Sequence, residues 1–383
     1  MAGINIRSPY YVKYTNTVGY SVKISIRVFT GVTPPSGYDY EIIKNFTTAI
    51  PYATVDISEL ARDFLDIEFS GDYLSQIVKV YVVYAVTDEP NGGGDPVTGG
   101  STTFYAFDGY GNFTEGVNPT LSETILIDNK VIYRPEDENI RIPIYDKAGT
   151  TTDVVFLNNG VSVRSESFTG STDTASAIKY IAVSGDISVD NYRQRVLADG
   201  GTYEGSSCLD AIDNQIDINL VDEVRVHRDG TYDKVVIKTM QCDKYPDRKV
   251  TFVNKLGALQ DVYFFAKEVE SITSTSEQYK ANVIDLSAPS YDVNKHQYRQ
   301  YNKQGRESIQ LNTGYVSEDY NEIITQMMMS EQVWLTKTTD EQSNVLPVIP
   351  KTSNVSFRTS LNDKLVAYTI DFDYAFDKIQ NIR

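Results

Sequence analysis

The sequence has 383 residues, and its 41% apolar fraction is enough for two or three domains with hydrophobic cores and too high for a disordered chain. Its 52 acidic residues outnumber the 35 lysines and arginines, so the formal net charge is −17. A chain of this charge repels phosphate backbones and anionic membrane surfaces, which argues against nucleic acid and lipid headgroups as partners.

Tyrosine is unusually frequent, with 28 residues against 15 phenylalanines and one tryptophan. Tyrosine forms strands well and is enriched at protein interfaces, so the composition indicates either a tyrosine-rich β protein or an extensive assembly surface. Cys208 and Cys242 are too few for a disulfide scaffold, and we expect two reduced thiols. No run of 18 apolar residues occurs and no signal-peptide pattern opens the chain, so we predict no membrane span.

Residues 1–120 are expected to form an N-terminal β domain. The alternation of apolar and polar residues over 20–28 predicts a half-buried strand, and residues 76–86 predict a buried one. Between them, residues 58–65 predict a brief amphipathic helix with Ser58 as its N-cap.

Residues 88–102 contain many glycines and prolines, which predicts a loop without regular structure that becomes ordered only on assembly. The loop lacks the Lys-Ser/Thr pair of a phosphate-binding loop, so we expect no nucleotide site there. The aromatic residues 104–113 then predict a strand, a tight turn and a second strand.

Residues 121–245 are expected to form a middle β domain. Short strands alternate with turns every 8–12 residues, a spacing typical of a sandwich or barrel. The clearest hairpin covers residues 224–238, where Asp229-Gly230 suits a tight primed turn. The charged, proline-containing residues 243–247 indicate the end of this domain.

No residue carries a convincing catalytic or metal-binding pattern. His227 and His296 are the only histidines, and neither has a motif around it, so we interpret both as surface or turn residues. Asp210, Asp213 and Asp217 follow a helical spacing without the glycine and closing glutamate of a calcium loop, which favours a solvated helix face or acidic loop.

Paired carboxylates for glycoside cleavage remain open among so many acidic residues. A sugar hydrolase usually brings several tryptophans to its groove, whereas this chain has only Trp334, which we expect in the core of the last domain. We therefore predict no catalytic residue, no cofactor and no metal ligand.

Residues 246–383 are expected to form a C-terminal β module with one short helix. Residues 251–265 predict a strand, a turn at Gly257 and a second strand, and residues 308–316 predict a further strand. A helix is predicted over 317–330, with Ser317 as its N-cap and an apolar stripe at Ile323, Ile324, Met327 and Met328.

Four more strands are predicted after this helix, the first at residues 333–335. Residues 345–350 read as an edge strand because Pro347 and Pro350 cannot donate ladder hydrogen bonds. Residues 355–359 and 365–374 form the last two strands, joined by a hairpin through residues 361–364. Alternate residues from Val366 to Tyr374 should share one buried face.

The C-terminal module resembles uncharacterised structural virion proteins of tailed bacteriophages, especially those of Bacteroidetes and marine bacteria. Five segments carry the resemblance, at residues 254–259, 311–315, 329–335, 348–351 and 364–375, and residues 4–10 are similar to the starts of such proteins. The family has no assigned catalytic residues, so the resemblance carries none over to this chain.

The resemblance implies a non-enzymatic structural subunit of the tail, neck or baseplate, assembled in the host cytoplasm from copies of itself and other virion proteins. One alternative is a receptor- or carbohydrate-binding fibre or adhesin. Another is a tail-spike depolymerase, although the long β-helix repeats of a spike are missing from the sequence. The expected fold is mainly β, with two to three β-sandwich-like domains and one or two short helices.

Overall fold

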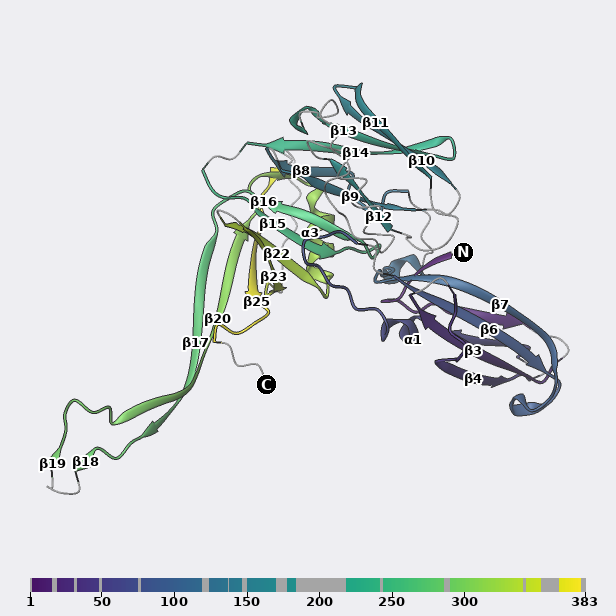
Figure 1. Cartoon of the computed structure of the whole chain (residues 1–383), viewed down its shortest axis with the longest axis horizontal. Helices are drawn as coiled ribbons and strands as arrows, with labels where there is room; N and C mark the ends of the chain where they lie inside the picture. Colours follow the sequence, from purple (N-terminus) through teal and green to yellow (C-terminus); the bar gives the residue numbers. More distant parts are fainter. Residues whose placement is uncertain are drawn as a thin grey trace. The chain divides into compact units, whose positions relative to one another are not determined.

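The computed structural model describes residues 2–15, 19–30, 33–47, 50–74, 77–118, 124–136, 138–146, 150–169, 178–183, 218–241, 244–285, 290–339, 342–352 and 365–379. The described chain is mainly β with two short α-helices, which confirms the expected fold class of β-sandwich-like domains (Figure 1). It divides into two compact units. Unit 1 comprises Met1–Gln241, Thr251–Tyr263 and Asp319–Glu331, and unit 2 comprises Cys242–Val250, Phe264–Glu318 and Gln332–Arg383.

Unit 1 begins with a five-stranded sheet in the order β1-β7-β6-β3-β4. Its strands are β1 (Ala2–Asn5), β3 (Ser21–Phe29), β4 (Tyr40–Asn45), β6 (Val78–Thr87) and β7 (Pro96–Phe107). Strands β2 (Tyr11–Thr15) and β5 (Tyr52–Asp56) pair separately as a two-stranded sheet. The strands predicted at residues 20–28 and 76–86 are thereby confirmed as β3 and β6.

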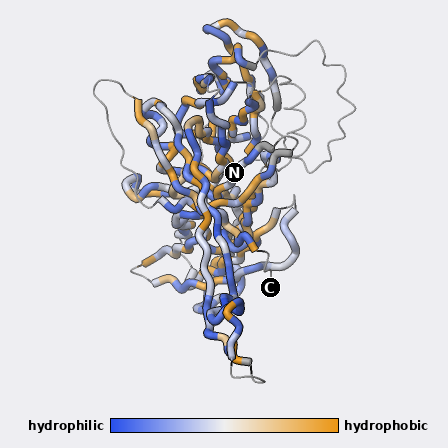
Figure 2. Tube along the Cα trace, turned by 90° about the vertical axis from the view of Figure 1, so that its left-hand side faces the viewer, coloured by the Kyte–Doolittle hydropathy of each residue, from blue (hydrophilic) through white to orange (hydrophobic). Residues whose placement is uncertain are grey.

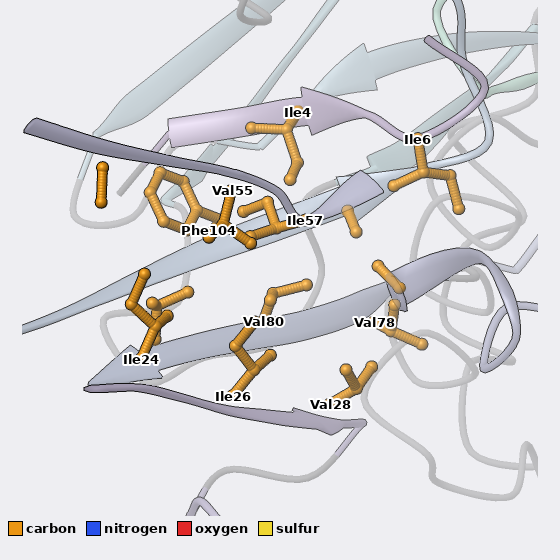
Figure 3. Close-up of a cluster of buried hydrophobic side chains, with 14 of the residues drawn as sticks. Ile4, Ile6, Ile24, Ile26, Val28, Val55, Ile57, Val78, Val80 and Phe104 are labelled. Atoms are coloured by element: carbon orange, nitrogen blue, oxygen red, sulfur yellow. The ribbon is translucent and has the colours of Figure 1, made fainter. Parts of the chain in front are cut away.

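The core of this region lies between the five-stranded sheet and the β2–β5 pair. Ile24 and Ile26 of β3, Val80 of β6 and Val55 of β5 belong to one cluster of buried side chains. Figure 3 shows these side chains pointing into a shared interior. The period-two alternation of β3 therefore reflects burial of one sheet face, as in a sandwich.

The glycine-rich segment 88–102 differs from its prediction. Residues 88–95 form no strand and contain only the short 3-10 turn η1 (Pro90–Gly92), whereas the residues from Pro96 onward belong to β7, paired antiparallel with β6. Gly100 lies opposite Tyr84, where an added Cβ atom would stand 2.4 Å from the tyrosine hydroxyl. The ring of Tyr84 covers the space that a side chain would need, so cross-strand packing outweighs the low strand propensity of glycine.

Two local predictions in this region need correction. Helix α1 (Ser58–Arg62) is capped by Ile57 without a side-chain hydrogen bond, because the hydroxyl of Ser58 donates instead to Asp56 Oδ1 at 2.7 Å. After β7 the chain forms the 3-10 turn η2 (Phe113–Glu115) where a second strand was expected.

The second half of unit 1 contains a five-stranded sheet in the order β11-β10-β13-β14-β8 and the pair β12-β9. Its strands are β8 (Val131–Pro135), β9 (Ile140–Tyr145), β10 (Thr151–Asn158), β11 (Val161–Thr169), β12 (Ile178–Val183), β13 (Glu223–Arg228) and β14 (Thr231–Met240), and the 3-10 turn η4 (Ile218–Leu220) precedes β13. The predicted hairpin is confirmed as β13–β14, since Asp229 and Gly230 have φ values of 50° and 79°.

Two segments from the C-terminal third complete unit 1. The strands β15 (Arg248–Val253) and β16 (Leu259–Phe264) flank Gly257, at φ 76°, which confirms the predicted strand, turn and strand. Helix α3 (Tyr320–Met329) is shorter than predicted and begins after Asp319. Ser317 does not cap it, because this residue pairs with Leu365 in the bridge between β21 (Val316–Ser317) and β24 (Leu365–Val366). The division into domains at 1–120, 121–245 and 246–383 stays a prediction.

Unit 2 is built on a sheet with the strand order β15-β22-β23-β25-β20-β17. Of β15, only the residues up to Val250 belong to this unit. The strands not yet bounded are β17 (Val269–Lys280), β18 (Ile284–Asp285), β19 (Ser290–Tyr291), β20 (Tyr298–Asn312), β22 (Val333–Thr339), β23 (Gln342–Pro350) and β25 (Thr369–Tyr374). Alternate residues from Val366 to Tyr374 are buried, as predicted, and so is Trp334. The rings of Phe264 and Phe372 pack edge to face at 6.1 Å.

The strand with two prolines is internal to this sheet, in contrast to the edge position predicted for it. β23 pairs with β22 over Gln342–Val348 and with β25 over Val348–Pro350. Pro347 pairs with Trp334 of β22, and its carbonyl also accepts the backbone N–H of Ala375, directly after β25, at 3.0 Å; Pro350 pairs with Phe372 of β25. Neither proline can donate a ladder hydrogen bond, but the strand is bonded on both sides through its other backbone groups. The predicted strand at 355–359, the hairpin at 361–364, Cys208, Cys242 and the three aspartates at 210, 213 and 217 lie outside the described residues.

Candidate assembly interface

The residues that the sequence singled out for chemistry do not converge on a site. His227 lies half-buried on β13 of unit 1, with its ring 5.2 Å from that of Tyr232. His296 is exposed in the turn before β20 of unit 2. Within the described ranges no group of three His, Cys, Asp or Glu side chains could hold a metal ion. No helix in that part of the chain is long and apolar enough to cross a membrane.

The most distinctive feature of unit 2 is a long two-stranded ribbon, which we call the arm (residues 269–312). Strands β17 and β20 pair antiparallel from Val269 opposite Gln310 to Lys280 opposite Tyr298. Figure 1 shows the two strands leaving the sheet together, with β18 and β19 near the tip. At roughly 3.3 Å per residue, the 12 residues of β17 alone span about 40 Å.

Both faces of the arm are in contact with solvent. All 12 residues of β17 are exposed, whereas the first six residues of β20 are exposed and its buried residues are Gly305, Ile309 and Leu311. The local sequence explains this, because residues 270–275 read Glu-Ser-Ile-Thr-Ser-Thr and are rich in β-branched residues without an apolar face. Such a segment forms a strand but has no side to bury in its own core.

A few side-chain contacts stabilise the arm internally. Near its base the hydroxyls of Ser271 and Ser308 lie 2.7 Å apart across the two strands. Lys337 of β22, which is not part of the arm, anchors the base through an ion pair with Glu270. Further out, the rings of Tyr279 and Tyr301 pack edge to face at 5.8 Å. Cross-strand pairs of these kinds each stabilise a ribbon by about 0.2–1 kcal/mol, so the arm has modest internal stability.

A β-bulge interrupts the arm between its base and its tip. The register shifts between Thr275 and Glu277, so that Asn302 and Lys303 of β20 oppose the single residue Ser276 of β17. Asn302 adopts a left-handed conformation at φ 52°. Bulges increase the local twist of a ribbon, which re-aims the strands beyond them.

Apolar side chains gather toward the tip of the arm. Ile284, Tyr291 and Val293 are 60%, 70% and 81% exposed, and Tyr298 is also mostly exposed. In Figure 2 the arm is largely hydrophilic along its length, and hydrophobic residues reappear near the tip. Several apolar side chains are therefore left in contact with solvent toward the end of the arm.

The returning strand of the arm is basic in an otherwise acidic protein. Residues 293–306 include Lys295, Arg299, Lys303 and Arg306 and no aspartate or glutamate, although the whole chain has a net charge of −17. This stretch therefore carries charge of the opposite sign to the chain as a whole.

Unit 1 has a second exposed apolar surface, which we call the Phe113 groove. It has a volume of about 1120 Å³ and is lined by residues 8–11, 111–113 and 116–118. Phe113 is fully exposed, at 101%, and Val117 and Tyr11 are mostly exposed beside it. A large ring left completely in water is unfavourable for an isolated subunit.

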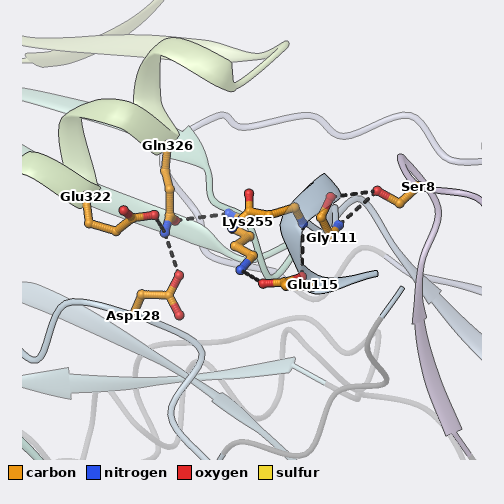
Figure 4. Close-up of polar contacts among 8 residues, drawn as sticks. Ser8, Gly111, Glu115, Asp128, Lys255, Glu322 and Gln326 are labelled. Carbon is orange, nitrogen blue, oxygen red and sulfur yellow. Dashed lines mark hydrogen bonds and ion pairs between the residues drawn. The ribbon is translucent and has the colours of Figure 1, made fainter. Parts of the chain in front are cut away.

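Polar contacts hold the turn that carries Phe113 (Figure 4). Glu115 Oε2 accepts a hydrogen bond from the backbone N–H of Asn112 at 2.9 Å, and its Oε1 pairs with Lys255 Nζ at 2.5 Å. The Lys255 ammonium lowers the pKa of the Glu115 carboxyl. The backbone N–H of Gly111 donates to Ser8 Oγ at 2.9 Å. The turn is thus fixed on both sides of the exposed ring.

The lysine of this network is itself positioned by α3 and its neighbourhood. The backbone N–H of Lys255 donates to Gln326 Oε1 at 3.1 Å, and Gln326 Nε2 donates to Asp128 Oδ2 at 2.7 Å. Burial raises the pKa of Asp128. Phe113 is therefore presented by a preorganised scaffold built from four separate segments of unit 1.

Sequence reasoning missed both surfaces. The signal for the arm was available, since residues 269–280 have high strand propensity and no apolar alternation, a pattern typical of a ribbon exposed on both faces. The Phe113 groove had no comparable signal, because aromatic residues at 104–113 are equally expected in a buried strand.

No protein-family model and no curated protein matches this chain. Among solved structures, the chain is similar to the one titled "Crystal structure of CBD12 from CALX1.2", at 8% identity over 45% of this chain and 72% of that chain, with a TM-score of 0.15. A likeness at this TM-score carries no argument about function.

Proposed function

We propose that this chain is a non-enzymatic structural component of a tailed-bacteriophage virion, in the tail, neck or baseplate, where it assembles as a repeated subunit with copies of itself and other virion proteins. The resemblance of the C-terminal residues to phage structural proteins supports the virion location. The exposed arm supports the assembly role.

The arm is the observation that carries the proposal. Its strand β17 is solvent-exposed at every position, and the outer edge of a two-stranded ribbon presents unpaired backbone N–H and C=O groups. An isolated hairpin gains little stability in water, so an arm of this length is favourable mainly when another chain covers it. Strand edges and exposed tyrosines suit that kind of contact.

A structural subunit of this type acts by repeating one contact. When the two contacting surfaces differ, each copy uses one surface to hold the next, and the series closes into a ring or continues as a sleeve. The chain requires no reacting group for this role.

The test combines the size of the purified chain with its presence in particles. We expect analytical ultracentrifugation of the full chain to show a concentration-dependent series ending in a discrete oligomer. We also expect mass spectrometry of purified particles to find the chain at a fixed ratio to the major tail proteins. A chain that stays monomeric at every concentration and is missing from particles would contradict the proposal.

The alternative of a carbohydrate-binding role has one observation in its favour. Tyr279, Tyr291, Tyr298 and Tyr301 are exposed on the arm, and aromatic rings can stack on sugars. A glycan array probed with the full chain separates the two functions. For a structural subunit we expect either no glycan binding or glycan binding that Tyr291→Ser leaves unchanged. Glycan binding that Tyr291→Ser abolishes would favour the carbohydrate-binding role.

A further inference from the structure

We propose that two copies of this chain pair through the free edges of their β17 strands, antiparallel and with Thr275 on the two-fold axis. This inference rests on the proposed structural function and names the partner and the register of one assembly contact. The pairing joins two arms into a four-stranded sheet with the order β20-β17-β17-β20. Backbone hydrogen bonds between strand edges supply the affinity in contacts of this kind.

β17 is the end strand of its sheet. It follows β20 at the end of the strand order, so one of its edges has no neighbouring strand among the described residues (Figure 1). All 12 residues of β17 are exposed, and in an edge strand every second residue points its backbone N–H and C=O outward. The free edge is therefore long enough for pairing along the whole strand.

The sequence of β17 lacks several devices that keep edge strands apart in monomeric proteins. Protected edges are commonly very short, contain proline or carry a bulge. β17 has 12 residues and no proline. The extra residue of the arm's bulge lies in β20, where Asn302 and Lys303 oppose Ser276, so β17 keeps its regular pleat. The outer edge is thus open to another strand.

The charge of the arm is compatible with a second copy as the partner. The whole chain has a net charge of −17, so two copies repel each other over most of their surfaces. The arm is an exception, because residues 269–312 contain five acidic and five basic residues, which cancel. Two arms can therefore approach each other without net repulsion.

The charged residues of β17 select the register. Two antiparallel registers give the longest overlap, one over residues 269–279 and centred on Ser274, the other over 270–280 and centred on Thr275. The second register places Glu270 of each copy opposite Lys280 of the other, whereas the first places Glu270 opposite an uncharged glutamine. Opposite charges on directly opposed residues stabilise a strand pair. The register centred on Thr275 therefore gains two ion pairs by symmetry.

Glu270 remains accessible for this contact. Its carboxylate pairs with Lys337 of β22, yet its side chain is still 56% exposed. Lys280 is exposed at the other end of the strand. The remaining charged residue, Glu277, would face Thr273 of the second copy, so the register brings no like charges opposite each other.

A contact of this kind has a definite consequence for assembly. Both copies use the same surface, so the contact is isologous and is complete with two copies. A ring or sleeve then consists of such pairs joined by a further contact.

The test uses two full-length cysteine variants, Thr275→Cys and Thr273→Cys. Both threonines are exposed and lie on the same face of β17, so the second variant is a matched control. On the axis, the two copies of position 275 lie directly opposite each other, with Cβ atoms about 5 Å apart. The two copies of position 273 are four residues out of line, which is roughly 13 Å along the strand.

We expect Thr275→Cys to give at least about tenfold more disulfide-linked dimer than Thr273→Cys, because a disulfide requires Cα atoms within about 7 Å. Mild oxidation and non-reducing electrophoresis measure the yield, and mass spectrometry should locate the bond at position 275 of both copies. The parent, with its own two cysteines, gives the background.

A charge test at the same position checks the axis independently. Thr275→Asp and Thr275→Lys each place two like charges opposite one another, whereas an equimolar mixture places opposite charges there. We expect the mixture to associate at least about threefold more tightly than either variant alone in analytical ultracentrifugation. Circular dichroism establishes that both variants are folded.

Other outcomes overturn the contact. If the parent associates but the two cysteine variants cross-link equally, or neither does, another surface or partner covers β17, and the contact is wrong while the proposed function stands. A mixture that associates no more tightly than its components shows that Thr275 is not on the axis. A parent that is monomeric at every concentration removes this contact, and the presence of the chain in purified particles then decides the proposed function separately.

Discussion

The side-chain amide of Asn254 donates a hydrogen bond to the carbonyl oxygen of Leu126 at 2.7 Å, and so joins two parts of unit 1 that are 128 residues apart in the sequence. The same amide also donates to Gln260 Oε1 at 2.9 Å. Its oxygen accepts the backbone N–H groups of Leu256 and Ala258. Asn254 is completely buried. Its side-chain nitrogen donates to two acceptors, and its side-chain oxygen accepts from two backbone N–H groups.

Replacing this asparagine should destabilise the protein strongly. Asn254→Ala removes the hydrogen-bond donor of two acceptors, the Leu126 carbonyl oxygen and Gln260 Oε1. It also removes the acceptor of the backbone N–H groups of Leu256 and Ala258. An unsatisfied buried group costs about 1–3 kcal/mol, so we expect a total loss of at least ~3 kcal/mol. Differential scanning calorimetry of the full chain measures the change. Asn344→Ala, at an exposed strand position, is the control; a similar small loss in both variants would contradict the role of Asn254.

Two glycines in left-handed turns should respond differently to the same substitution. Gly257 and Gly230 have φ values of 76° and 79°, so alanine is strained at both by about 1 kcal/mol. An added Cβ atom at Gly257 would lie 2.8 Å from Phe107 Cβ and 3.0 Å from two backbone nitrogens, whereas at Gly230 nothing lies within 4 Å.

We therefore expect Gly257→Ala to lower the free energy of unfolding by at least ~2 kcal/mol more than Gly230→Ala, because overpacking against backbone adds to the strain. Thermal unfolding followed by circular dichroism compares the two. Equal losses would mean that the close approach of the β15–β16 turn to Phe107 is unimportant.

Asp108 should make stability depend on pH. Burial raises the pKa of its carboxyl to about 6, against the opposing effect of Arg7. Because the folded state holds this proton more tightly than the unfolded state, the contribution is favourable below about pH 4 and is lost as pH rises through about 6. Asp108→Asn should therefore raise the free energy of unfolding near pH 8 by about 1–3 kcal/mol.

Urea denaturation at about pH 4 and about pH 8 checks this sign. The stability gained by Asp108→Asn over the parent should be larger at the higher pH. Asp95→Asn, which removes an exposed carboxyl, is the control. A gain of equal size at both pH values would show that the aspartate acts through packing and not through its charge.

Hydrogen exchange should report whether the arm is covered in the assembly. In a dissociated subunit the backbone N–H groups of β17 should exchange much faster than those of β3, because β17 is fully exposed and β3 lies inside a sheet. In the assembled state we expect at least tenfold slower exchange over residues 276–301. Mass spectrometry of peptides from the two states gives the comparison, with β3 as the internal reference. Unchanged exchange in the arm would exclude it as an assembly contact.

Local structure was predictable where the residues of one short segment determine its conformation. The β13–β14 hairpin followed from Asp229-Gly230, because only residues that tolerate positive φ make that turn. The buried face from Val366 to Tyr374 followed from period-two alternation. The errors arose where a distant strand intervened: pairing of β7 with β6 ordered residues expected to be a loop, and pairing of Ser317 with Leu365 removed a predicted helix cap.

The candidate assembly interface was not predictable in the same way. The exposed position of Phe113 depends on the ion pair between Glu115 and Lys255, which are 140 residues apart in the sequence. The length of the arm depends on the pairing of β17 with β20 across the 17 residues between them.

The sequence by itself determined the mainly β character, the tight turns and the alternation of buried faces, because these depend on the conformational preferences of residues close together in the chain. Only the tertiary structure decided which strands are neighbours, which apolar residues remain in water and where the arm leaves its sheet. Those outcomes depend on long-range pairing and packing, in which a local preference is outweighed by the burial and hydrogen bonds that distant segments supply.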